Sequence, residues 1–424
     1  MRKAIRNYAV FLGRCARIAF VGDWRYYSWM GALTVVCLLG LHAYARQFVD
    51  GLIVTGMGDE VSWGVYIANF TFLVGVAAAA VMMVIPVYIY NNEELHDLVI
   101  FGELLAVAAI IMCLAFVTVD LGRPDRFWHL IPGIGQFNFP ASMLSWDVVV
   151  LNGYLLLNVH ICGYLLYCRY RSRKPARWFY IPFVFIAIVW AVSIHTVTAF
   201  LYVGLGGRPF WNSSIVGPRF LASAFTAGPA LIILALQIIR RVTHYHITDR
   251  ALLTLRGIIQ VSMLINVFLL INELFKEFYS GNLHIASSKY LFLGLDGHHA
   301  LVPWIWTAIT FNLIAMFLLI LPVSRSLKWL NFTCVLCIIG IWIEKGMGLV
   351  IPGFIPTPLG EIVEYTPSLN ETLISFGIWS FGLLCYTVFL RMSVPILQGR
   401  LNQANEGVPA TVAAAREITS TSPA

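Results

Sequence analysis

Long apolar segments alternate with short polar segments along the whole chain. Ten of the apolar segments stand out, and they lie at about 26–46, 62–90, 98–119, 144–168, 178–203, 219–240, 253–275, 300–322, 329–350 and 372–394. A helix needs about 20 apolar residues to cross the hydrocarbon core of a bilayer. Membrane β-strands alternate polar and apolar residues over about 10 positions, whereas these runs are continuous. The pattern predicts an all-α, polytopic integral membrane protein with about ten transmembrane helices.

The composition agrees with this class. Of the 424 residues, 59% are hydrophobic and only 12% are charged, whereas soluble proteins carry about 25% charged residues. So few charges cannot cover the surface of a soluble protein of this length, and so much apolar sequence excludes a disordered chain. The lipid bilayer is therefore the expected surrounding.

The basic residues are distributed unevenly between the two ends of the expected helices. Most of the 28 Lys and Arg residues fall in 1–25, in the loops after every second helix and in 395–424. Lys and Arg are enriched in cytoplasmic loops, so we expect the N-terminal segment 1–25 and the tail 395–424 to be cytoplasmic, in the cell inner (cytoplasmic) membrane. This topology explains the net charge of +7 without a nucleic-acid partner. The acidic loop 91–97 is an exception on the inner side.

The first apolar run has one other interpretation. Ala43-Tyr44-Ala45 formally resembles a signal-peptide cleavage site, but a leader of about 25 mainly polar residues would precede the run. We therefore expect a retained helix.

The cysteines and histidines argue against a metal centre in this chain. The eight cysteines are scattered, and the one close pair, Cys334 and Cys337, has no second pair to complete a zinc site or an iron–sulfur cluster. Two stacked haems need two histidines on one helix, and none of the expected helices has them. A single haem between His42 and His195 is left open at this point.

Charged groups inside a bilayer are costly and usually mark a site or a pathway. His42, Asp147, His195, Glu273 and the Glu344-Lys345 pair lie towards the expected outer end of their helices, whereas Glu103 and His160 lie in the inner halves. Structural pairing of Glu344 with Lys345, or of Glu273 with Lys276, is the simpler interpretation for those two sets. His42 and Asp147 fall near the loop 120–126, where donors and acceptors gather. Such a site suits a quinone headgroup.

Several motifs resemble the NrfD-type, or polysulfide reductase membrane subunit, family. These are Trp63-Gly-Val-Tyr-Ile-Ala-Asn-Phe70, Asp120-Leu-Gly-Arg-Pro-Asp-Arg-Phe-Trp-His129 and Ser142-Met-Leu-Ser-Trp-Asp147. Three further segments resemble the ten-helix branch of this family: His195-Thr-Val-Thr-Ala-Phe200, Arg208-Pro-Phe-Trp211 and Trp342-Ile-Glu-Lys345. Within that branch the sequence most resembles the DsrP group, the quinone-interacting subunits of the DsrMKJOP complexes of dissimilatory sulfur metabolism.

The resemblance implies an architecture and a site. It implies a first four-helix bundle over 26–168 that holds a menaquinone site, a second over 178–322, and two additional transmembrane helices over 329–394. The family's pocket uses a first-helix histidine, matched by His42, the Asp120 loop and the fourth helix. The expected cofactor-binding residues are His42, Tyr66, Asp120, Arg123, Trp146, Asp147 and Tyr154. His42 and Asp147 are the expected catalytic groups, and either Tyr66 or Tyr154 is the pocket tyrosine.

The resemblance also implies partners and a role. We expect exchangeable menaquinone as the cofactor, with no haem, iron–sulfur cluster or metal in this chain. The expected partners are a periplasmic ferredoxin-like iron–sulfur subunit, a multihaem cytochrome c, a membrane cytochrome b and cytoplasmic iron–sulfur subunits. If redox chemistry is coupled to proton movement, Glu103, His160 and Glu273 are the candidate path. The alternatives are a proton or solute transporter and an inert membrane anchor of a redox complex.

Overall fold

The computed structural model describes residues 2–281 and 285–403, with the side chains of its first helix described from Arg6 onward. The described chain is almost wholly helical, and ten of its helical segments are long and apolar enough to cross a membrane. The predicted all-α class and the predicted ten spans are therefore confirmed.

The helices in chain order are α1 (Arg2–Ala19), α2 (Trp24–Asp50), η1 (Leu52–Val54), α3 (Val65–Ala78), α4 (Val81–Tyr88), α5 (Glu93–His96), α6 (Val99–Asp120), η2 (Pro124–Leu130), α7 (Met143–Tyr170), α8 (Arg177–Val203), α9 (Val216–Thr243), α10 (Asp249–Ser280), α11 (Ile285–Phe292), α12 (Val302–Ile320), η3 (Pro322–Arg325), α13 (Leu327–Lys345), α14 (Met347–Val350), η4 (Pro352–Phe354) and α15 (Leu369–Leu397). Two spans combine several of these elements: Val65–Tyr88 contains α3 and α4, and Leu327–Phe354 contains α13, α14 and η4.

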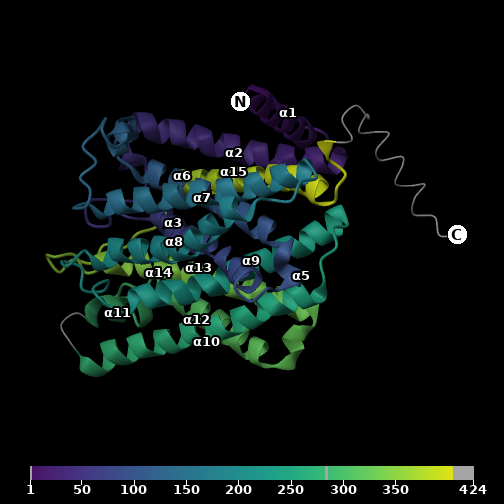
Figure 1. Ribbon diagram of the computed structural model, residues 1–424. Helices are drawn as coiled ribbons and strands as arrows, with labels where there is room; N and C mark the ends of the chain where they lie inside the picture. Colours follow the sequence, from purple (N-terminus) through teal and green to yellow (C-terminus); the bar gives the residue numbers. More distant parts are fainter. Residues whose placement is uncertain (1, 282–284, 404–424) are drawn as a thin grey trace.

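The spans lie side by side, and α2 begins at the same end of the molecule at which α15 ends (Figure 1). This end carries most of the Lys and Arg residues, among them Arg6, Arg173, Lys174 and Arg241, and we call it the basic end. The opposite end, where α2 and α6 end and α7 begins, is called the loop end. The sequence predicts that the basic end is cytoplasmic, and this orientation stays a prediction.

The last two spans occupy different places in the bundle. α15 packs against α2, α6, α3 and α7, whereas α13 packs against α12, α9 and α3. The two helices of the expected unit 329–394 thus lie apart, one beside α2 and α6 and the other beside α9 and α12. The division of 26–168 and 178–322 into two four-helix bundles stays a prediction.

One span is interrupted, which the continuous apolar run at 329–350 did not predict. Between α13 and α14, Gly346 leaves the helical region at φ −86° and ψ −100°. Between α3 and α4 the backbone stays helical and only tightens, with Met83 N donating to Ala80 O at 2.9 Å. The two spans pack on one another, and a Cβ on Gly346 would lie 3.3 Å from Ala68 O of α3. The absence of a side chain at Gly346 therefore lets α3 lie close to the break.

α2 is held mainly by α15 and is the least buried of the ten spans. The two helices cross at Gly40 and Gly377: a Cβ on Gly40 would lie 2.6 Å from Gly377 Cα, and a Cβ on Gly377 would lie 2.7 Å from Gly40 Cα. Small residues let membrane helices approach closely, so dispersion contacts can hold them together. The attachment of α2 therefore depends on both glycines.

We predict that Gly377→Leu separates α2 from α15 and lowers the melting temperature of the purified protein in detergent, because overpacking costs about 1–3 kcal/mol. Gly31→Leu is the matched control, since Gly31 also lies on α2 and has open space around its Cα. Thermal unfolding followed by light scattering and fluorescence measures both. Equal melting temperatures for the two variants would contradict the proposed crossing.

Candidate functional site

A buried polar cluster lies at the loop end, where α2, α3 and α6 meet. Gln47 of α2 donates from Nε2 to Val119 O at 2.6 Å and accepts from the Tyr66 hydroxyl at 2.7 Å. Both side chains are buried, and the charge of Asp120, the last residue of α6, acts on Tyr66. Asp120 Oδ1 is buried and has no hydrogen-bond donor among the described residues. The cluster thus contains one free acceptor surrounded by satisfied groups.

A second carboxylate, Glu371, supports this cluster from α15. Glu371 is fully buried and accepts from Gly56 N at 2.6 Å, Ser368 N at 2.8 Å and the Tyr365 hydroxyl at 2.6 Å. Burial, followed by the charge of Glu371, raises the pKa of Tyr365 well above its usual value, so this hydroxyl stays protonated and donates. Tyr365 in turn accepts from Val65 N at 2.9 Å, at the start of α3. The capping box of α15 therefore fixes the entrance of α3 beside Tyr66.

Asp147 lies in a neighbouring buried site on α7. Its Oδ1 accepts from the Thr198 hydroxyl of α8 at 3.0 Å. Tyr202, one turn further along α8, pairs with the Thr71 hydroxyl of α3 at 2.5 Å. The charges of Asp147 and Asp120 both act on Tyr202.

The structure brings together some of the predicted pocket residues and separates others. Tyr66 and Asp120 share the cluster, whereas His42 lies on the exposed face of α2, away from the buried Asp147. Arg123 is largely exposed and pairs with Asp125 at 2.9 Å. Trp146 is half-buried and donates to Pro140 O at 2.9 Å. Tyr154 is buried deeper on α7, where the charge of Glu103 acts on it, so Tyr66 is the tyrosine beside Asp120.

Glu103 and His160, two of the three predicted proton-path residues, occupy different surroundings. Glu103 is buried on α6 and accepts from the Cys162 thiol of α7 at 3.0 Å. His160 is half-buried and lies 3.3 Å from Phe179 O through Nε2. Successive helical residues are rotated by about 100°, so His160 and Cys162 face nearly opposite sides of α7.

The third predicted path residue, Glu273, belongs to a network of four helices centred on Arg219 of α9. Arg219 pairs with Glu273 of α10 and, at 2.6 Å, with Glu344 of α13. Glu344 also accepts from Asn312 of α12 at 2.6 Å and from Asn266 of α10 at 3.4 Å. One guanidinium is therefore shared by two carboxylates.

The structural pairs expected from the sequence are wrong in both sets. Lys276 pairs with Glu277 at 3.1 Å rather than with Glu273. Lys345 is buried and forms no ion pair with Glu344 among the described residues, although the charge of Glu344 acts on it. Consecutive residues of a helix point to different sides. Lys345 Nζ donates to Phe220 O at 3.3 Å and lies 4.3 Å from the centroid of the Phe220 ring.

Lys345 also acts electrostatically on two groups of the other helices, Cys113 of α6 and His195 of α8. His195 is fully buried, and neither ring nitrogen has a hydrogen-bond partner among the described residues. His42, by contrast, is exposed on α2. In the part of the chain that the structure describes, no group of three or more His, Cys, Asp or Glu side chains could hold a metal ion.

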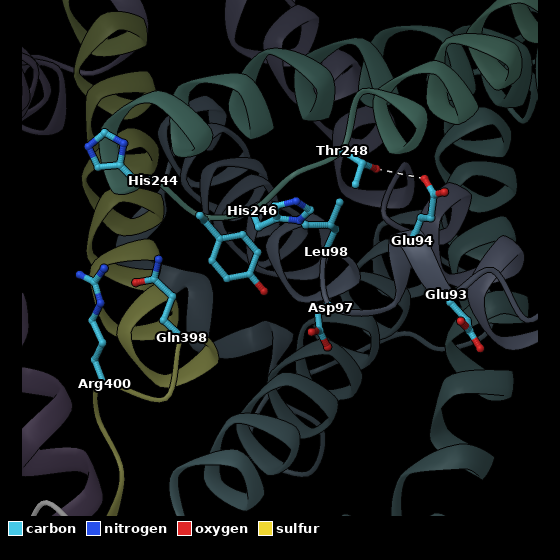
Figure 2. Close-up of a pocket in the computed structure, with 10 residues that line it drawn as sticks. Glu93, Glu94, Asp97, Leu98, His244, His246, Thr248, Gln398 and Arg400 are labelled. Atoms are coloured by element: carbon cyan, nitrogen blue, oxygen red, sulfur yellow. Dashed lines mark hydrogen bonds between the residues drawn. The ribbon is translucent and has the colours of Figure 1, made fainter. Parts of the chain in front are cut away.

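Two hollows open at the basic end. The first, of about 510 Å³, contains the acidic residues that break the charge pattern, and Figure 2 shows Glu94 turned towards Thr248, with their hydrogen bond at 3.0 Å. Glu94 also pairs with Arg250 at 3.0 Å. The second hollow, of about 530 Å³, is lined in part by Tyr88 and Tyr180. The charge of the buried Glu103 acts on Tyr88, one of the residues that line this hollow.

Three members of the loop-end cluster, Gln47, Tyr365 and Glu371, were missed by the sequence analysis. Ser368-x-x-Glu371 is a recognisable capping-box sequence, and this signal would have shown Glu371 as a structural acceptor. Gln47 had a weaker signal, since it is a lone amide at the end of an apolar run.

Comparisons with known proteins agree with this architecture. The family model described as "Polysulphide reductase, NrfD" matches residues 53–356. The "Hdr-like menaquinol oxidoreductase integral membrane subunit" of Archaeoglobus fulgidus is 24% identical over 385 residues, which are 87% of this chain and 93% of that protein. A selenate reductase subunit of Mesobacillus selenatarsenatis is 22% identical, over 86% of this chain and 93% of that protein.

A shorter match is more similar in sequence. A polysulfide reductase component of Wolinella succinogenes is 29% identical over 187 residues, which are 40% of this chain and 56% of that protein. The family model covers well over half of the chain, including the Trp63 and Asp120 motifs. This multi-pass membrane protein therefore belongs to the NrfD, or polysulphide reductase, family.

Proposed function

We propose that this chain is the membrane subunit of a respiratory redox complex and exchanges electrons between menaquinone and an iron–sulfur subunit. The observation that carries the proposal is the buried Oδ1 of Asp120 beside Tyr66, which has no donor among the described residues. Buried polar groups are normally hydrogen-bonded, so this oxygen calls for a donor from outside the chain. The Archaeoglobus relative is named as a menaquinol oxidoreductase subunit, and a quinol hydroxyl is such a donor.

The residues of the cluster fit this ligand. When bound, menaquinone supplies two-electron chemistry coupled to two protons. Asp120 Oδ1 would accept a hydrogen bond from a hydroxyl of the reduced ligand and would receive the proton of that hydroxyl. Gln47 and Tyr66 are fixed by their mutual hydrogen bond and by Val119 O, so they would form a rigid wall that orients the headgroup.

His42 and Asp147 keep proposed roles, although the structure separates them. His42 lies on the exposed face of α2, which the bilayer would cover, and would meet a membrane-dissolved ligand on its way to Asp120. Asp147 would be the next group to receive the proton after Asp120, because the charges of both carboxylates act on Tyr202. Arg123 and Trp146 remain proposed contacts at the loop end.

A proton route towards the basic end is part of the proposal. On this route we place Asp147, Cys113 and Lys345, because the charges of Asp147 and Lys345 both act on Cys113. On the other side, Glu103 and Cys162 lead towards Tyr88 and the second hollow.

The other two predicted path residues have weaker connections to this route. Glu273 would act through its shared partner Arg219. His160 faces another side of α7, so its participation rests on the sequence alone.

The proposed partners follow from the same family. A ferredoxin-like iron–sulfur subunit would dock on the loop end, where Phe127, Ile134 and Phe139 are exposed in the segment after Asp120. A multihaem cytochrome c, a membrane cytochrome b and cytoplasmic iron–sulfur subunits would complete a complex of dissimilatory sulfur metabolism of the DsrP type. The loop end would then face the periplasm across the inner membrane.

One observation favours a proton or solute transporter as a second candidate function. Transporter sites are built around discontinuous helices, and here one span breaks at Gly346, directly after the buried Glu344 and Lys345. The two functions are compatible if proton movement is driven by quinol oxidation.

Asp120→Asn is expected to lower the rate of menaquinol oxidation by the intact complex by about a hundredfold, because an amide cannot accept the proton that a general base takes. Reduction of the partner's iron–sulfur centres by a menaquinol analogue, followed by absorbance, measures this rate. Asp50→Asn is the matched control, since Asp50 also ends a spanning helix at the loop end but is exposed. A normal rate in Asp120→Asn would exclude this site. His42→Ala tests the entry role in the same assay.

For the proton route, Glu103→Gln is expected to leave menaquinol oxidation unchanged and to abolish proton movement across vesicles that hold the intact complex. The amide keeps the size of the side chain and removes the titrating group. Acidification reported by a pH-sensitive dye measures the movement, and Glu277→Gln at the loop end is the control. Proton movement at the control rate in Glu103→Gln would rule out this route.

A further inference from the structure

α1 lies at the basic end and packs with one face against α15 and against the last turns of α7. Phe11, Cys15 and Ala19 of α1 are buried. The Phe11 ring lies 5.3 Å from Tyr167 and 5.1 Å from Tyr170 between ring centroids. The remainder of α1 projects outside the packed spans (Figure 1).

The side of α1 that faces away from the packed spans is basic. Arg6 and Arg17 are exposed and Arg14 is half-buried, and none of the three forms a salt bridge with a described residue. At about 100° per residue they fall along one side of the helix, opposite Phe11, Cys15 and Ala19. Leu12 is 49% exposed at the edge of the packed face. Residues 1–22 contain no acid to neutralise the arginines.

The direction of α1 is fixed by the corner that joins it to α2. Three consecutive carbonyl groups at its end have donors: Ala19 O accepts from the Tyr26 hydroxyl at 2.5 Å, Phe20 O from the Tyr27 hydroxyl at 2.8 Å, and Val21 O from Arg391 at 2.6 Å. The unpaired carbonyls of this helix end are thus satisfied by α2 and α15. α1 is therefore held at a set angle to the bundle.

Aromatic side chains around α1 indicate the level of the lipid headgroups. Exposed Trp and Tyr side chains mark the boundary between membrane and water, and here Trp24, Tyr27, Trp29 and Trp178 are all exposed at the basic end. Basic residues at the same end of the neighbouring helices, such as Arg173 and Lys174, lie in the adjoining loop. A helix at this level with an exposed basic side matches an interfacial helix.

We propose that α1 is a binding site for anionic phospholipid, whose headgroups contact Arg6, Arg14 and Arg17 while Leu12, at the edge of the packed face, contacts the acyl chains. The charge of the helix and the lack of described acidic partners for these three arginines select an anionic lipid over a zwitterionic one. Each basic side chain near an anionic membrane surface strengthens binding about fivefold, so the three together account for about a hundredfold. The site is independent of the proposed redox function.

Native mass spectrometry of the purified full-length protein, exchanged into mixed phosphatidylglycerol and phosphatidylcholine, measures the lipids retained. The wild type is expected to retain phosphatidylglycerol selectively. The triple variant Arg6→Gln, Arg14→Gln, Arg17→Gln is expected to lose this selectivity by at least tenfold. The matched control is Arg173→Gln, Lys174→Gln, Arg241→Gln, which removes equal charge from exposed positions at the same end.

Three outcomes would overturn the proposal. Equal loss of selectivity in the control would assign the effect to net charge, and unchanged selectivity in the triple variant would place the lipid elsewhere. The third outcome concerns Arg6→Lys, Arg14→Lys, Arg17→Lys, which keeps the charge and should keep phosphatidylglycerol even if the Gln variant folds poorly. Loss of the lipid in this variant, with retention of an acidic protein instead, would make α1 a protein-docking helix.

Discussion

A charged side chain inside a bilayer is stable only when it is paired, and in this protein the guanidinium of Arg219 pairs with two carboxylates. Arg219 lies between Glu273 and Glu344, with Asn312 and Asn266 on the remaining oxygen. Removing one partner of a buried ion pair destabilises a protein by about 3–5 kcal/mol. The network therefore fixes the mutual positions of α9, α10, α12 and α13, and the end of α13 depends on it.

The end of α13 connects this network to the rest of the molecule. Glu344 faces the Arg219 network and Lys345 faces α9 on its other side, near Cys113 and His195. The helix then breaks at Gly346, which lies against Ala68 of α3. Charge and discontinuity thus coincide at the boundary between the two sides of the bundle. A change in the protonation of Glu344 or Lys345 would alter the electrostatics of the Arg219 network and of Cys113 and His195. The proposed coupling of redox chemistry to proton movement would need such a link.

The sequence predicted the spans well, because membrane thickness imposes a length that any apolar run reveals. The family resemblance named Tyr66 and Asp120, which the structure places in one cluster, and their role in binding stays a prediction. Prediction from the sequence failed where partners come from distant helices. Arg219 looked like a loop residue at the start of a span, and nothing local indicated that it reaches Glu273 and Glu344. The exposed position of His42 had the same origin, because the register of α2 is set by its glycine crossing with α15.

The crossing of α2 with α15 joins the first span of the chain to the last. Gly40 is made more than 300 residues before Gly377, so during synthesis α2 enters the bilayer without its main neighbour. Contacts of such long sequence separation form late in folding. The corner that holds α1 is completed late as well, because Arg391 belongs to the same last helix. Membrane assembly of this protein is thus completed from its C-terminal span backwards, and the first helix is locked only when the final one has been inserted.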